Sequence, residues 1–158
     1  MGRLLGWLPV IGTILAPVIW RFRVEDRSME PSLAPGKGIV CRSLGTRRPA
    51  RGSIVVFRHP RRPEMWLVKR VVGLPGEEVV VDFGEVIVDG RSGVDVWGAG
   101  QETFPEGRWR VGPASVFVLS DNRPATVDDG RIFGPVPIGG MMRVIWPRPQ
   151  PDQPTEEP

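Results

Sequence analysis

Hydrophobic and polar residues alternate in short segments over most of the chain beyond residue 38, and glycine or proline separates these segments. Alternation with a period of two places one set of side chains on each face of a strand. Segments of this kind, rich in Val, Ile and Phe, are typical of half-buried antiparallel strands. The pattern predicts a mainly β domain with strands in residues 38–42, 53–59, 65–73, 78–83, 85–90 and 115–121.

The remaining segments of this domain carry turn and loop signals. Asp89-Gly90 predicts a tight turn at the end of a strand. Residues 96–109 have the composition of a loop that leaves the sheet, and no helix of ten or more residues is expected after residue 23. Residues 148–158 are rich in proline and acidic, which predicts a disordered tail.

The N-terminal segment differs from the rest, because residues 4–20 carry no charge. Seventeen residues are at the short end of a membrane-spanning helix, and Trp7 and Trp20 lie near the ends, where interfacial aromatic residues belong. We therefore expect residues 1–23 to form a membrane anchor or an interfacial segment, with a buried hairpin as the alternative. The sequence agrees less well with a cleaved signal peptide, because no small-x-small cleavage site follows the segment.

The composition restricts the possible chemistry. The chain has one cysteine, Cys41, one histidine, His59, and two lysines, Lys37 and Lys69, beside nineteen arginines. This excludes an internal disulfide framework, a cysteine-rich zinc site and a histidine-rich metal site. The arginines are scattered among acidic residues without a long basic run, so no nucleic-acid partner is expected despite the net charge of +3.

Lys69 stands in an apolar strand segment. On a strand its side chain shares a face with Leu67 and Val71. The side chain could extend its ammonium group to solvent. It could instead be desolvated, which lowers the pKa of a lysine and yields a neutral amine that can act as a general base near neutral pH.

Two further segments carry candidate groups. Ser28 lies in a proline-containing connector between the apolar segment and the first predicted strand, where a serine can also be purely structural. Residues 120–131 follow a predicted strand and are dense in polar side chains. They either satisfy their own turn backbone or orient a catalytic base.

Four blocks occur in a characteristic order: SMEPSL at 28–33, RGSIVVF at 51–57, KRVVGLPGE at 69–77, and DNR at 121–123 continuing to RIFGPV at 131–136. Together they resemble the bacterial type I signal peptidase family, Ser–Lys endopeptidases that remove signal peptides. The resemblance covers residues 24–146. It implies a catalytic core of antiparallel sheets over residues 24–147, preceded by an N-terminal apolar helical segment.

The resemblance also implies roles for individual residues. Ser28 is the expected nucleophile and Lys69 the expected general base. Thr126 falls where the family has a hydroxyl that positions the lysine amine, and Asp128 and Arg131 fall on a structural acid and arginine. The shallow apolar pockets for small substrate side chains would be lined by Met29, Leu33, Leu67 and Val68.

The sequence departs from the family pattern at three places. Asp26 stands where a serine or glycine is usual, and an ionised aspartate cannot donate to an oxyanion. Either Asp26 points away from the site, or another group supplies the second donor. Ser120 replaces a usual glycine, and the stretch 122–131 has one additional residue, with Asp129-Gly130 before the arginine.

The predicted function is a membrane-tethered serine endopeptidase that removes signal peptides with small-x-small ends from translocated precursor proteins, without metal or cofactor. Its expected partners are these precursors and the lipid membrane. The expected location is the bacterial cytoplasmic membrane, with one span and the catalytic domain on the outer face. Three alternatives remain: a maturation protease for one precursor, such as that of nickel superoxide dismutase, a Ser28–His59 pair, and a non-catalytic β-barrel binding module.

Overall fold

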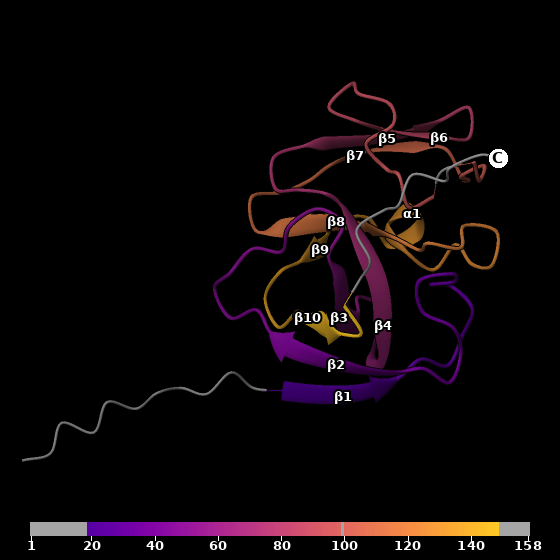
Figure 1. Ribbon diagram of the computed structural model, residues 1–158. Coiled ribbons are helices and arrows are strands. Elements are labelled where there is room, and N and C mark those ends of the chain that lie inside the picture. Colours follow the sequence, from indigo (N-terminus) through magenta and orange to yellow (C-terminus); the bar gives the residue numbers. More distant parts are fainter. Residues whose placement is uncertain (1–18, 99, 149–158) are drawn as a thin grey trace, which may run out of the picture.

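The computed structural model describes residues 19–98 and 100–148 and folds them mainly into antiparallel β-structure (Figure 1). Their elements are, in chain order, β1 (Ile19–Arg23), β2 (Gly38–Ser43), β3 (Ile54–His59), β4 (Arg62–Gly73), β5 (Glu78–Asp82), β6 (Glu85–Val88), β7 (Gly107–Arg110), β8 (Ser115–Leu119), α1 (Gly130–Phe133), β9 (Val136–Pro137) and β10 (Met142–Trp146).

The larger sheet has seven strands in the order β1-β2-β10-β3-β4-β8-β9, and its neighbouring strands are antiparallel. The twelve-residue strand β4 runs from the level of β1 and β2 to the level of β8 (Figure 1). Its first half pairs with β3 alone, whereas β8 joins it only from Arg70 onward. Within the described residues, the second edge of the first half of β4 therefore has no partner strand.

The smaller sheet, in the order β6-β5-β7, lies above β8 in Figure 1. Its hairpin turns at Phe83-Gly84, and a second tight turn follows at Asp89-Gly90, where both residues have positive φ (47° and 72°). The latter turn confirms the expectation from the sequence. Gly73 allows the two sheets to approach, because a Cβ at this position would lie 2.5 Å from Val79 Cγ2.

Three clusters of buried apolar side chains hold these layers together. One lies under β1, β2 and β10, one between β3, β4 and β8, and one between β8 and the smaller sheet. Cys41 belongs to the first cluster and is fully buried. Burial raises the pKa of its thiol to about 11, so Cys41 packs as a small apolar side chain.

The mainly β class and the six expected strands are confirmed, and the only described helix has four residues. The expectation of a loop over residues 96–109 is wrong at its end, because β7 begins at Gly107 and pairs with β5. Trp109 anchors this strand on Phe117, with the ring centroids 4.9 Å apart. Such a long-range contact leaves no local signal in a segment as polar as GRWR.

The structure bears only partly on the two ends of the chain. Strand β1 takes up residues 19–23, which were included in the expected N-terminal segment, and pairs with β2. The other expectations for that segment fall on residues 1–18, and those for the tail fall on residues 149–158, all outside the described residues. None of the helices that the structure describes is long and apolar enough to cross a membrane.

Candidate active site

Ser28 lies in the turn that connects β1 with β2, and its position is fixed from both sides. Met29 and Leu33 bury their side chains in the apolar cluster beneath this turn. On the other side, the backbone N–H of Asn122 donates to the carbonyl of Ser28 over 2.9 Å. The side-chain amide of Asn122 also donates to the carbonyl of Arg27. The turn is therefore attached to the polar segment that follows β8.

Lys69 reaches Ser28 from strand β4. Its Nζ atom donates a hydrogen bond of 2.8 Å to the hydroxyl oxygen of Ser28, its one hydrogen-bond partner among the described residues. Both side chains are buried, with 1% of Lys69 and 2% of Ser28 exposed. Of the two side-chain positions considered for Lys69, the structure thus has the desolvated one.

The surroundings of Lys69 favour the neutral amine. Burial lowers the pKa of Lys69 below its ordinary value of 10.5, and the positive charge of Arg131 acts in the same direction. The carboxylates of Asp26, Asp129 and Asp128 oppose this shift without cancelling it. A lysine with a lowered pKa is a stronger candidate for a general base than an exposed lysine.

Asp26 points toward Ser28 instead of away from it. The backbone N–H of Ser28 donates to Asp26 Oδ1 over 2.9 Å, which is the geometry of an Asx-turn. Burial alone would raise the pKa of Asp26. The hydrogen bonds from Ser28 and the nearby charge of Lys69 outweigh this effect and lower the pKa below 3.8. Asp26 is therefore an anion at neutral pH.

The buried acid that pairs with Arg131 is Asp129, although the sequence placed Asp128 in this position. Arg131 Nε and Nη2 donate to the two carboxylate oxygens of Asp129 over 2.9 and 2.8 Å. Asp129 also accepts the backbone N–H of Ser120 and caps the first turn of α1. The additional residue in this stretch moves the buried acid one position along the chain.

Asp128 belongs to a different cluster, and about a third of its side chain is exposed. Its carboxylate binds His59 Nε2 over 3.0 Å and Arg62 Nη2 over 2.6 Å. The Thr126 hydroxyl accepts the backbone N–H of Asp128 over 3.0 Å and makes no hydrogen bond with Lys69. Thr126 thus holds the loop that carries Asp128 in place of the direct contact with the lysine amine that the resemblance implied.

His59 ends strand β3 and is buried, with 4% of its surface exposed. Its Nδ1 atom accepts the backbone N–H groups of Arg61 and Arg62. Its Nε2 atom lies 3.0 Å from Asp128 Oδ1 and 3.0 Å from Arg62 Nη2. Both ring nitrogens are thus engaged, and neither has a hydrogen bond with Ser28, which counts against a Ser28–His59 pair.

A buried ion pair holds β4 beside the Ser28 turn. Arg70 Nε and Nη2 donate to the carboxylate of Asp121 over 2.7 and 2.5 Å, and both side chains are at most 3% exposed. Arg70 Nη2 also donates to the hydroxyl of Ser32, in the same turn as Ser28. This network joins the strand that carries Lys69 to the turn that carries Ser28.

Sequence reasoning also did not anticipate the environment of Ser120. In the register of β4 and β8, Arg70 faces Leu119, and Ser120 directly follows Leu119 at the end of β8. Ser120 is fully buried, and its hydroxyl has no hydrogen-bond partner among the described residues. The sequence signal for Ser120 was the serine at a position where the family usually has glycine. The sequence signal for the role of Asp129 was a second acidic residue, next to Asp128 and directly before Gly130.

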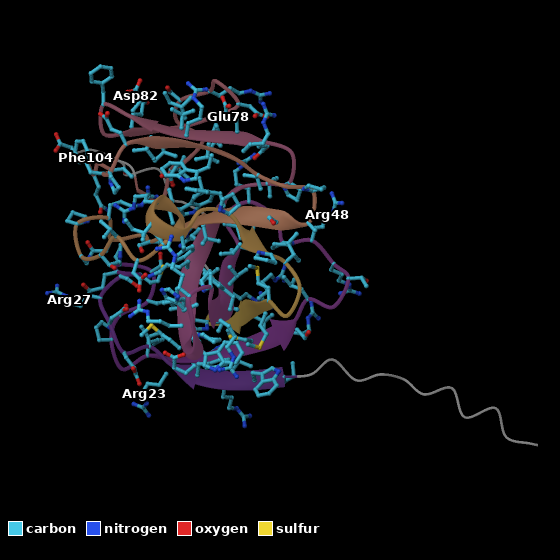
Figure 2. The ribbon with its side chains drawn as sticks, turned by 180° about the vertical axis from the view of Figure 1, so that it is seen from behind. Arg23, Arg27, Arg48, Glu78, Asp82 and Phe104 are labelled. Carbon is cyan, nitrogen blue, oxygen red and sulfur yellow. The ribbon has the colours of Figure 1, made fainter. Side chains whose placement is uncertain are left out.

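A groove of about 630 Å³ reaches Lys69, the hydrogen-bond partner of Ser28. One side of the groove is formed by β1 and the residues that follow it, and the other side by the first half of β4. Leu67 and Val68 are among its lining residues. Met29 and Leu33 lie in the core next to Ser28 and are not among the lining residues. Arg27, adjacent to Ser28, points outward from the protein on this side (Figure 2).

Comparisons with known proteins agree with this description. A family described as signal peptidase, peptidase S26, matches residues 3–145. A probable signal peptidase I-2 of Synechocystis is 32% identical, covering 92% of this chain and 74% of its own. A signal peptidase I of Bacillus caldolyticus is 30% identical, covering 87% of this chain and 85% of its own.

A crystal structure of a signal peptidase I from Enterococcus faecalis superposes with a TM-score of 0.54 at 28% identity, covering 63% of this chain and 97% of the other. Fold and comparisons define a serine endopeptidase of the S26 class. The chain belongs to the signal peptidase family of that class, as the resemblance indicated. Signal peptidase I enzymes are typically anchored in a membrane.

Proposed function

We propose that this protein removes N-terminal signal peptides from translocated precursor proteins, with Ser28 as the nucleophile and Lys69 as the general base. The observation that carries the proposal is the 2.8 Å hydrogen bond between Lys69 Nζ and Ser28 Oγ, inside a family of serine endopeptidases. A serine hydroxyl is a weak nucleophile and needs an adjacent base. The buried amine of Lys69 meets this need.

The reaction follows from this pair. Neutral Lys69 accepts the hydroxyl proton as Ser28 Oγ attacks the scissile carbonyl carbon and forms a tetrahedral intermediate. The intermediate collapses to an acyl-enzyme as the lysine ammonium donates the proton to the leaving amine. The amine, neutral again, then accepts a proton from a water molecule whose oxygen attacks the ester carbonyl. As the bond between the carbonyl carbon and Ser28 Oγ breaks, the lysine ammonium returns this proton to Ser28 Oγ, which restores the free hydroxyl and the neutral amine.

The polar segment after β8 supplies the positioning residues. Arg131 and Asp129 form a fully hydrogen-bonded pair beside Lys69, and the charge of Arg131 favours the neutral amine. Asp128 adds a negative charge on the same side, and Thr126 holds its backbone. We assign Thr126, Asp128 and Arg131 an indirect role, in which they hold the charges that tune the pKa of Lys69.

The groove suits an extended peptide with small side chains. Since the first half of β4 has an unpaired edge next to Ser28, a substrate can add to it as an antiparallel or parallel strand through backbone hydrogen bonds. Leu67 and Val68 line the groove, and Met29 and Leu33 support the turn from beneath. This apolar surface favours the small-x-small ends of signal peptides.

We assign the protein to the bacterial cytoplasmic membrane, with its catalytic domain on the outer face. The uncharged residues 4–20 and the membrane anchoring typical of signal peptidase I support this assignment. Trp20 on β1 and Trp146 on β10 are both about half exposed, on strands that flank β2. Exposed indole rings favour the interface between lipid and water.

Cleavage of a signal-peptide substrate with a small-x-small site tests the proposal. We expect Ser28→Ala and Lys69→Ala to abolish cleavage. Lys37→Ala is the control, because it removes the second lysine of the chain, which is exposed, and we expect this variant to retain cleavage. Full activity of Lys69→Ala would contradict the proposed base. A binding module would keep its function in both active-site variants. A maturation protease would cleave one precursor and ignore a panel of unrelated signal peptides.

A further inference from the structure

The contact between Asp26 and Ser28 does not suit the stabilisation of an oxyanion, because the Asp26 carboxylate occupies the backbone N–H of Ser28. Asp26 Oδ1 accepts the backbone N–H of Ser28 at 2.9 Å, and the positive charge of Lys69 helps to lower the pKa of Asp26. The Asp26 side chain is exposed and lines the groove beside the Ser28–Lys69 pair. A carboxylate thus holds the N–H that lies next to the nucleophilic oxygen.

Peptide hydrolysis by a serine passes through a tetrahedral oxyanion, which enzymes stabilise with N–H or O–H donors aimed at the developing charge. The backbone N–H of the nucleophile is one such donor, but it carries a single proton. It cannot donate well to Asp26 and to the substrate oxygen at the same time. An ionised carboxylate at this point would also repel the negative charge that forms on the substrate.

We propose that Asp26 is a competitor for the oxyanion site of this enzyme: its carboxylate occupies the Ser28 N–H in the free protein and must turn away when the substrate carbonyl enters. This inference rests on the proposed function. The exposure of Asp26 makes the movement feasible, because a side chain that rotates into solvent keeps its charge hydrated. The movement breaks the hydrogen bond from the Ser28 N–H to Asp26 Oδ1.

The carboxylate also acts on the base. Lys69 faces the carboxylates of Asp26, Asp128 and Asp129 and the guanidinium of Arg131, and Asp26 has the largest effect among these charges. Its negative charge favours the ammonium form of Lys69, which cannot accept a proton. Occupation of the N–H and stabilisation of the ammonium both oppose acylation, so the removal of this charge has to change both kcat/KM and its pH dependence.

Four variants separate these effects. Asp26→Asn removes the charge at nearly constant shape and offers an amide N–H, and Asp26→Ser offers a hydroxyl donor. Asp26→Glu keeps the charge on a longer side chain. Asp82→Asn removes the same charge from β5, in the smaller sheet and well above Arg27 in Figure 2, and serves as the control.

We expect Asp26→Asn and Asp26→Ser to raise kcat/KM about tenfold or more and to move the ascending limb of the pH profile, which Lys69 sets, to lower pH. A gain of one oxyanion donor corresponds to changes of this size or larger. We expect Asp26→Glu to leave the ascending limb near its wild-type position, and Asp82→Asn to match wild type. A several-fold loss in both neutral variants, with melting temperatures unchanged, overturns the proposal, because Asp26 would then assist the reaction.

The contact itself can be observed without activity. In a ¹⁵N–¹H correlation spectrum of the wild-type protein, the Ser28 amide proton should shift in acid as Asp26 is protonated, and this titration should be absent in Asp26→Asn. A Ser28 amide that does not titrate overturns the inference whether or not the protein cleaves signal peptides. Cleavage that is independent of Ser28 would instead refute the proposed function, and the amide titration would still test the contact.

Discussion

Lys69 Nζ lies 2.8 Å from Ser28 Oγ, although 41 residues separate the two positions along the chain. Two networks produce this approach. The Arg70–Asp121 ion pair with its bond to Ser32 holds the strand, and the bonds from Asn122 hold the turn. Both polar atoms are removed from water, so each depends on the other for its hydrogen bond.

The burial of Lys69 implies that the catalytic arrangement is obtained at the expense of stability. We expect Lys69→Met, which keeps an unbranched side chain of similar size without the amine, to abolish cleavage and to raise the melting temperature at pH 7. The sign follows from linkage. Since the pKa of Lys69 is lower in the folded than in the unfolded protein, the unfolded state binds more protons between the two values.

Wild-type stability should therefore rise with pH within that window, relative to Lys69→Met, and the advantage of the variant should shrink above neutral pH. Calorimetric or chemical unfolding at several pH values measures this difference. A variant less stable than wild type at pH 7, or a difference independent of pH, would contradict a lowered pKa of Lys69.

The pH dependence of cleavage should also reveal the titration of Lys69. Because the neutral amine is the base, kcat/KM should rise with pH through the pKa of Lys69 and level off above it. The midpoint of this rise should lie below 10.5, since burial lowers the pKa. Measurement between pH 6 and 11 on the free enzyme tests this, and a rate that does not change across this range would indicate that no such lysine titrates.

His59 provides a contrast, because its bonds with Asp128 and its edge contact with Phe133 are structural. We expect His59→Asn to keep kcat/KM within about threefold of wild type while lowering the melting temperature, since a buried hydrogen-bond network is disturbed. Cleavage assays with thermal unfolding measure both effects. A loss of activity as large as that of Lys69→Ala would favour a histidine as the base.

The Arg70–Asp121 pair should dominate the stability of the site. Removal of one partner of a buried ion pair leaves an uncompensated charge, so we expect Asp121→Ala to lower the free energy of unfolding by about 3–5 kcal/mol. Glu78→Ala breaks the exposed pair with Arg108 and should change it by less than about 1 kcal/mol. Equal effects in denaturant unfolding would contradict the importance of the buried network.

The sequence predicted the parts of the molecule that depend on local pattern. The alternation of apolar residues located β4 and its lysine, and Asp89-Gly90 located a turn. Strand β10 was missed although Met142 and Val144 alternate, because only two of its positions are buried. Strand β7 depends on packing of Trp109 against a residue that is distant along the chain.

In the site, the order of motifs was sufficient to bring Ser28 and Lys69 forward as a pair, but not to assign their neighbours. One additional residue between Asn122 and Arg131 exchanges the environments of Asp128 and Asp129, and only the contacts distinguish the two. The orientation of Asp26 was open for a similar reason, since a single rotation about its side chain turns it toward or away from Ser28.

Trapping of the acyl-enzyme tests the central claim most directly. In rapid-quench mass spectrometry with a signal-peptide substrate, the account predicts that the N-terminal product becomes attached to the proteolytic fragment that contains Ser28. This adduct should be absent from Ser28→Ala and Lys69→Ala and present in His59→Asn. An adduct on another residue, or one that forms at the wild-type rate without the Lys69 amine, would contradict the Ser28–Lys69 mechanism.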